Sequence, residues 1–154
     1  MYPYFQRTTP LQAAESSPPD PIRTFLSQSP AFGTIIFQVT GGQGAFPIPN
    51  AEIIITKSLS NRLSLSISLL TDESGRTEPV SLPAPSRSLS LSPNNGNVYA
   101  SYEAKVTAEG YLPTKIKNLP VFDGITTLQP VNLTTDFGQP PNTVNEIEDK
   151  EPDL

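Results

Sequence analysis

The segment LSLSISLL, residues 63–70, alternates Leu or Ile with Ser over most of its length. A period of two places the apolar side chains on one face of a β-strand and the serines on the other. A helix would scatter the same apolar residues around its circumference, and Ser disfavours helix interiors. We therefore predict a half-buried strand here, with the serines facing solvent.

The same alternation recurs on both sides of this segment. Turn-forming sequences separate the runs, among them the glycine-rich Gly41–Gly44, TDESG at Thr71–Gly75 and the pair Asp123–Gly124. Seven short strands with such turns and no helical period predict an all-β fold, a seven-stranded antiparallel β-sandwich of Ig-like type. The predicted strands are Thr34–Thr40, Ala51–Thr56, Leu63–Leu70, Arg76–Leu82, Val98–Ala108, Tyr111–Leu119 and Ile125–Leu133.

Composition divides the 154 residues into three parts. Residues 1–32 hold six of the 18 prolines and are predicted to be an extended tail, with Ile22–Ser27 as a short strand or a helical turn. Residues 33–133 form the sandwich. Residues 134–154 form a C-terminal tail that carries the whole net charge of −5. We expect this acidic tail to be solvated, or to act as an electrostatic handle for a basic partner.

The residue inventory restricts the chemistry that the chain can perform. It has no His and no Cys, which removes the usual proton-transfer group, thiolate catalysis, disulfides and Cys-based metal sites. The serines have no Gly-x-Ser-x-Gly motif around them. The acids Asp72 and Glu73 lie in a turn and lack the spacing of a calcium loop. We therefore predict no enzyme, no catalytic residues, no cofactor and no metal site.

Neither nucleic acid nor a membrane is an expected partner. The basic residues form only the loose group Lys105, Lys115 and Lys117, and an acidic tail repels phosphates. No apolar run approaches the roughly 18 residues that a membrane span requires. The first ten residues lack the pattern of a secretory signal, so we expect a soluble protein.

Apolar side chains in the N-terminal tail and on the outer strand faces form the candidate docking set. Tail aromatics are expected to dock on the chain's own body, or on a neighbouring subunit by adding a strand to a sheet edge. Ile36 and Ile54 fall on the wrong face by simple alternation. Both point outward if their strands lie side by side, unless a bulge reverses the facing. The set is Tyr2, Tyr4, Phe5, Ile22, Phe25, Leu26, Ile36 and Ile54.

Several segments together carry a family resemblance. These are GTIIFQVT at residues 33–40, LLTDESGRT at 69–77, AEGY at 108–111 and VFDGITTLQPVNL at 121–133. In this order they resemble the carboxypeptidase regulatory-like (transthyretin-like) domain family, and most of all its members in Gram-positive spore-forming bacteria. The resemblance covers residues 33–133 and leaves both tails unexplained.

The resemblance implies a β-sandwich that supports folding, adhesion or assembly. Relatives that hydrolyse 5-hydroxyisourate depend on His and a C-terminal tetrapeptide, but this chain has no His and ends in EPDL. The Lys–Asn cross-link of some adhesin modules is not expected either, since the first strand holds no Lys opposite Asn132.

The predicted function is a structural subunit of a bacterial surface, spore or virus-like assembly, with the N-terminal tail docked on a neighbouring copy in an oligomer or filament. The alternative is a monomeric binding module for a cell-wall glycan or a spore cortex-lytic enzyme, so that the partner is a component of the cell envelope. Outside such a setting the protein would be cytoplasmic.

Overall fold

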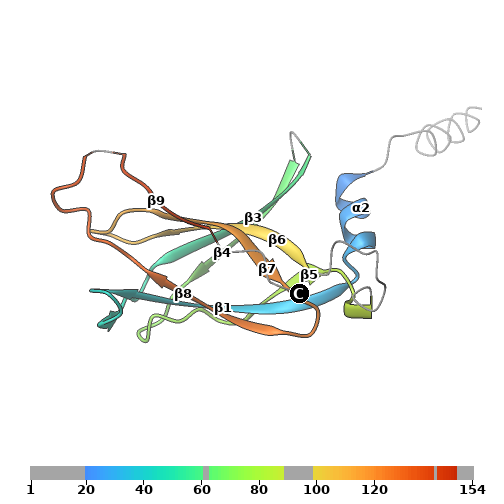
Figure 1. The fold of residues 1–154 in the computed structure, drawn as a ribbon, viewed down its shortest axis with the longest axis horizontal. Helices are drawn as coiled ribbons and strands as arrows, with labels where there is room; N and C mark the ends of the chain where they lie inside the picture. Colours follow the sequence, from blue (N-terminus) through green and yellow to red (C-terminus); the bar gives the residue numbers. More distant parts are fainter. Residues whose placement is uncertain (1–19, 61–62, 89–98, 141, 149–154) are drawn as a thin grey trace, which may run out of the picture.

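A computed structural model describes residues 20–60, 63–88, 99–140 and 142–148. These residues form two β-sheets packed face to face and one short helix near the N-terminal end (Figure 1). The predicted all-β sandwich is confirmed. The strand inventory differs from the prediction, because the described residues form nine strands in two mixed sheets rather than seven antiparallel strands.

The first sheet is built around β1 (Ala31–Gly41). On one side β1 pairs antiparallel with β2 (Phe46–Pro47) and with β5 (Val80–Ala84). On the other side it pairs parallel with β8 (Thr126–Asn132). Turn signals mark where strands end and do not say which strands become neighbours, so the parallel pair was not predicted.

The second sheet has the order β4-β3-β6-β7-β9. It contains β3 (Glu52–Ser60), β4 (Leu63–Leu70), β6 (Ala100–Thr107), β7 (Thr114–Val121) and β9 (Asn145–Glu148). Its strand pairs are antiparallel except that of β7 with β9. Strand β4 lies at one edge and β9 at the other.

The core lies between the two sheets and follows the predicted alternation. In β1 the side chains of Ile35, Phe37 and Val39 are completely buried, and from the opposite sheet Ile53 and Ile116 meet them. Burying an aliphatic or aromatic side chain of this size contributes about 1.5–3 kcal/mol. Apolar contacts between alternate residues of the two sheets therefore contribute most of the stability of the sandwich.

The turn after β4 forms where the TDESG sequence predicts it. The Asp72 carboxylate accepts hydrogen bonds from the Ser74 hydroxyl at 2.6 Å and from the backbone N–H groups of Ser74 and Arg76 at 2.9 and 3.1 Å. These bonds, that of the Ser74 hydroxyl first, lower the pKa of Asp72. Gly75 has φ +78°, and a Cβ there would lie 2.5 Å from the Val39 carbonyl oxygen. Only glycine suits this close approach.

Prolines delay two strands relative to the prediction. The strand predicted from Arg76 begins only at Val80, after Pro79, and Arg76 itself makes one isolated bridge, to Gln38. The strand predicted from Tyr111 begins at Thr114, after a proline. Proline has no N–H to donate to a strand ladder, which explains both late starts.

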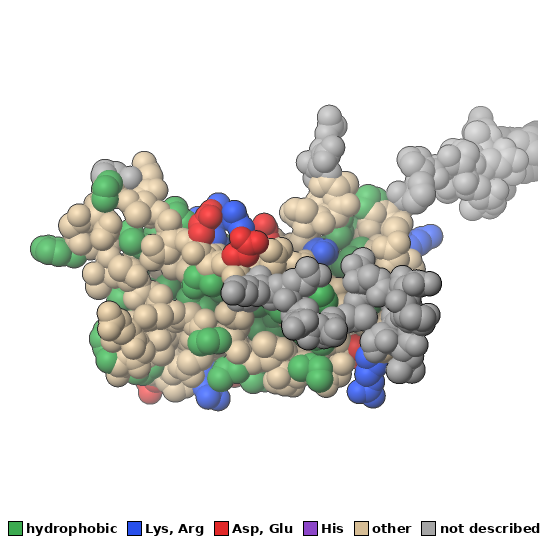
Figure 2. All heavy atoms as spheres, in the orientation of Figure 1, with side chains coloured by type: hydrophobic (Ala, Val, Ile, Leu, Met, Phe, Trp, Pro, Cys, Tyr) green, Lys and Arg blue, Asp and Glu red, His purple; other side chains and the backbone are tan. Residues whose placement is uncertain are grey.

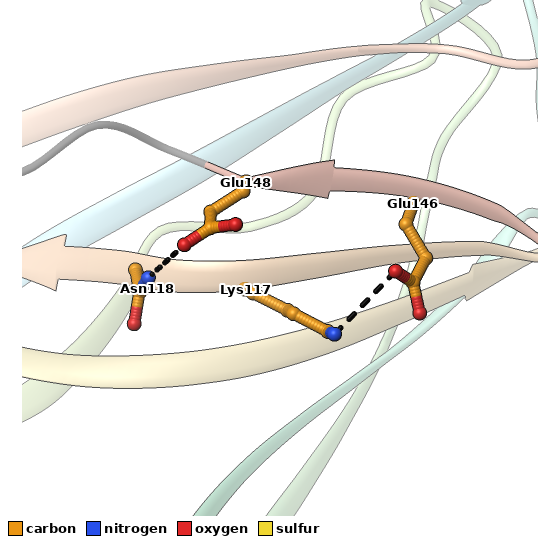
Figure 3. A network of polar contacts seen from close by, with 4 residues as sticks. All are labelled: Lys117, Asn118, Glu146 and Glu148. Carbon is orange, nitrogen blue, oxygen red and sulfur yellow. Dashed lines mark hydrogen bonds and ion pairs between the residues drawn. The ribbon is translucent and has the colours of Figure 1, made fainter.

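Part of the acidic C-terminal segment is paired in the sheet, while its carboxylates stay exposed to solvent. Strand β9 lies along β7, where Lys117 Nζ and Glu146 Oε2 form an ion pair at 3.4 Å (Figure 3). Asn118 Nδ2 donates a hydrogen bond of 2.9 Å to Glu148 Oε1. Glu146 thus has its cationic neighbour within the same chain, and the role of the tail as a handle for a basic partner stays a prediction. The predicted division at residues 32/33 and 133/134 stays a prediction.

Candidate partner-docking groove

The helix α2 (Pro21–Gln28) resolves the alternative left open for the N-terminal tail. Asp20 is its N-cap, and the Asp20 side chain accepts a hydrogen bond of 3.0 Å from the backbone N–H of Ile22. Pro21 occupies the first turn, where its missing N–H costs nothing. The segment is a helix and not a strand.

Phe25 attaches this helix to the sandwich. Its ring meets the ring of Tyr102 in β6 nearly at right angles, with 6.4 Å between centroids. The ammonium group of Lys57 in β3 lies 5.8 Å from the Phe25 ring centroid and 5.6 Å from that of Tyr102. Edge-to-face and cation–π geometries of this kind are favourable. This tail aromatic therefore docks on the chain's own body.

Lys57 has few polar partners for its position. Its Nζ donates a hydrogen bond of 2.7 Å to the backbone oxygen of Ser101, and burial lowers its pKa. An ammonium group has three donors, and no carboxylate of the described residues lies within ion-pairing distance of this one. The site thus holds a cation with room for an acceptor.

A groove of about 900 Å³ lies between α2 and the end of the β3–β4 hairpin. Its walls include Thr24 and Phe25 from the helix, Lys57 and Leu59 from β3, and Tyr99 from the segment before β6. Figure 2 shows the helix and the hairpin as two neighbouring projections on one side of the molecule. The groove combines aromatic rings, hydroxyl groups and one cation.

Strand β4 is the outer strand of the same hairpin and forms the edge of its sheet. Its apolar side chains, predicted to be core residues, are only partly covered: Ile67 is 37% exposed, whereas its cross-strand partner Ile55 is 2% exposed. No described strand pairs with the outer edge of β4. Its eight residues include neither a charged residue nor a proline, which are the usual protections of an exposed edge.

The predicted docking residues are spread over several surfaces. On α2, Ile22 and Phe25 are half-buried while Leu26 is exposed. The residues Tyr2, Tyr4 and Phe5 lie outside the described part of the chain.

Ile36 and Ile54 both point outward, although the condition under which we expected this, that their strands lie side by side, is not met. Their strands, β1 and β3, belong to different sheets, so the two side chains point outward on opposite faces of the sandwich. The pairing around each residue is regular, and no bulge reverses its facing. Ile36 has Leu128 of β8, which is 48% exposed, as its direct neighbour.

Sequence reasoning missed Lys57 as a site residue although a signal was present. Lys57 follows Ile53 and Ile55 at a period of two, so it occupies an inward position of β3.

Tyr102, which contacts Phe25 and Lys57, is a core residue, as expected for an alternating strand. Its hydroxyl donates a hydrogen bond of 2.6 Å to the Pro83 backbone oxygen, and burial raises the pKa of this hydroxyl.

The described residues show neither a metal-binding cluster nor a membrane-spanning helix. No group of three or more His, Cys, Asp or Glu side chains in this part of the chain converges as a metal site would require. No helix there is both long and apolar enough to cross a membrane.

Comparison with known proteins identifies no family for this chain. No family model matches it, and no curated protein matches it. The resemblance to transthyretin-like domains therefore stays a prediction.

Similar solved structures do exist. One is catechol 1,2-dioxygenase from Acinetobacter sp. ADP1, at TM-score 0.49 and 15% identity over 77% of this chain and 58% of the enzyme. A second is the Bacillus anthracis TIE protein, at TM-score 0.45 and 15% identity over 68% of this chain and 17% of that protein. A third is a type II cohesin–X-dockerin complex from Acetivibrio cellulolyticus, at TM-score 0.40 and 17% identity over 67% of this chain and 58% of the matched one.

The prediction that the chain is not an enzyme is corrected by these similarities. Several of the similar structures are catechol 1,2-dioxygenases, including those of Pseudomonas arvilla and Rhodococcus opacus. The chain spans little more than half the length of these dioxygenases, and at 15–16% identity the likeness concerns the fold alone.

Proposed function

We propose that this chain is an assembly module that binds an extended segment along the free edge of β4, and that the segment is the N-terminal part of a neighbouring copy. The observation that carries the proposal is the edge itself. Along residues 63–70 it has no described neighbour strand, no charged residue and no proline.

The edge suits a strand better than any other occupant. Each main-chain hydrogen bond to an added strand contributes about 0.5–1.5 kcal/mol net, and alternate side chains of that strand would cover the half-exposed Leu65, Ile67 and Leu69. The edges of the other sheet are less suitable, since β5 contains Pro83 and β8 contains Pro130.

The N-terminal residues suit the edge by position and by sequence. The described chain begins at Asp20, beside the groove that the β3–β4 hairpin borders. Nineteen residues precede it, enough to reach roughly 60 Å when extended. Residues 4–9 (YFQRTT) are free of proline, so each of the six carries an N–H group that can donate to a strand ladder.

The test is the solution mass by light scattering of three proteins: the full chain, a chain lacking residues 1–19, and Ile67→Lys. We expect oligomers of the full chain and monomers of the other two, at 16.6 kDa for Ile67→Lys and at a correspondingly lower mass for the truncated chain. Leu128→Lys is the matched control, because it adds the same charge at an exposed apolar residue of the other sheet, and it should still assemble. A monomeric full chain, or an oligomer that survives removal of residues 1–19, would overturn the proposal.

A second candidate is a monomeric module that binds a cell-wall glycan. The groove favours it, because Phe25 lines it with a ring suited to stacking while Thr24, Ser58 and Ser101 offer hydroxyl groups. Retention of a monomeric full chain on peptidoglycan, abolished by Phe25→Ala, would support this function over assembly. For either candidate, the proposed bacterial surface, spore or virus-like setting follows from the sequence resemblance.

A further inference from the structure

A turn after β8 displays the most exposed aromatic side chain of the described residues. Phe137 is 91% exposed, although burying a ring of this size is worth about 1.5–3 kcal/mol. The ring is held out by a fixed turn: the Gln139 N–H donates to the Asp136 oxygen at 3.1 Å, and Gly138 has φ +76°. The Asp136 N–H donates in turn to the Gly110 oxygen at 3.1 Å, which ties the turn to the loop before β7.

The turn and the groove lie at opposite ends of the molecule. Figure 1 shows the segment between β8 and β9 at one end of the longest axis, and α2 with the end of the β3–β4 hairpin toward the other. The pairing agrees with this view. Residues Tyr111 and Thr135 form a bridge at the end where β6 finishes, whereas the groove uses residues at the start of β6. One copy thus presents a projection at one end and a hollow toward the other.

The two ends are complementary in chemistry. The turn offers a phenyl ring next to the carboxylate of Asp136. The groove offers the ring of Phe25 and, beside it, the ammonium group of Lys57, whose only described acceptor is the Ser101 oxygen. A carboxylate near a half-buried lysine forms a stronger pair than it would on an open surface.

We propose that the turn Asp136–Gly138 of one copy inserts into the groove of the next, with Phe137 against Phe25 and the Asp136 carboxylate near Lys57. This inference rests on the proposed function, which is self-assembly, and adds a second contact to it. Because the two contacting surfaces differ, the arrangement is head-to-tail and extends into a filament or closes into a ring.

The inference also explains how an N-terminal segment reaches its neighbour. Helix α2 forms one wall of the groove. A copy seated in the groove therefore lies beside the place where residues 1–19 join the described chain, within the reach of nineteen residues.

The experiment separates the two halves of the contact. Phe137→Ser removes the projection, and Thr24→Trp fills the groove from an exposed helix position. Each variant alone should associate at least tenfold more weakly than the full chain in sedimentation velocity. An equimolar mixture should recover a complex of two chains, because each variant retains the half that the other lacks. Phe46→Ala is the control: this exposed aromatic lies in β2, outside the turn, and its loss should not weaken association.

The outcomes distinguish this inference from the proposed function. If Phe137→Ser and Thr24→Trp assemble like the full chain while removal of residues 1–19 gives monomers, the head-to-tail contact is wrong and the β4 edge remains. If both variants weaken association and their mixture recovers nothing, the turn does not enter the groove, and the inference is again overturned. A full chain that is monomeric throughout overturns both.

Discussion

The two edges of the five-stranded sheet differ in length, charge and partner. Strand β4 is eight residues long, uncharged and joined to β3 as a hairpin. Strand β9 has four residues, two of them glutamates, and joins β7 in parallel with support from Lys117 and Asn118. Short length and charge both discourage further strand addition. Among the described residues, one edge of this sheet is therefore protected and the other has no neighbour strand, which is why we propose the docking function at β4.

Coverage of the apolar face differs in the same direction. Ile55 and Ile67 are direct partners across the β3–β4 hairpin, yet one is fully buried and the other is not. The inner face of the hairpin is therefore less well covered at β4 than at β3.

The largest expected change in stability is the one between substitutions at Ile55 and at Ile67. Ile55→Ala should lower the free energy of unfolding by about 2–5 kcal/mol, because it leaves a cavity in the packed core. Ile67→Ala removes the same atoms at a half-exposed site and should cost about 1 kcal/mol. Urea denaturation of the two variants at low protein concentration checks this. Equal losses would mean that β4 is as well covered as β3.

The closed edge gives the second prediction. Ile147 of β9 is half-buried and packs against the core, so Ile147→Ala should destabilise the strand by about 1 kcal/mol. Hydrogen exchange should then quicken at the amides of β7 more than at those of β3. The exposed Val144, just before β9, supplies the control, since Val144→Ala should leave the exchange of β7 unchanged.

The ion pair on β9 has a smaller effect. Lys117 and Glu146 are each about half exposed, and pairs of this kind contribute less than about 1 kcal/mol. Glu146→Gln should therefore destabilise slightly at low salt and not at all at 1 M salt, where screening is nearly complete. Glu109→Gln, at an exposed acid outside the sheets, should show neither effect. A loss that persists at 1 M salt would contradict a purely ionic role.

The smallest effect concerns the turn that follows β4. The folded-state pKa of Asp72 lies below the ordinary value of an Asp carboxyl, chiefly because of its bond with the Ser74 hydroxyl. Its contribution to stability is therefore full above pH 4 and declines as the pH falls through the lower folded value. Asp72→Asn should flatten the pH dependence of the melting temperature in that window. An unchanged acid limb would show that other carboxylates dominate.

A strand with a strict two-residue period could be predicted to the residue. A strand that forms only because a neighbouring strand pairs with it could not. Leu63–Leu70 has the predicted bounds, because alternation alone sets them. Strand β9 was missed, since NEIE carries only one apolar side chain and exists as a strand only through β7.

The docking groove was predictable only in part. Phe25 was named from composition. The position of Lys57 beside it depends on pairing between strands and on a helix that a six-residue pattern could not distinguish from a strand. The sequence therefore predicted an aromatic docking residue. It did not predict which side chains lie beside that residue, because the tertiary fold determines them.

The parallel pair of β1 with β8 bears on how the chain folds during synthesis. Thr34 pairs with Thr126 and Thr40 with Asn132. The hydrogen-bonding groups on one side of β1 therefore stay unpaired until β8 has been synthesised. At ordinary rates of translation the intervening residues take on the order of ten seconds to appear. Sheets closed by such distant segments fold slowly. A nascent chain would complete the β3–β4 hairpin first and expose the apolar TIIFQV of β1 meanwhile, which makes this strand the natural contact for a chaperone.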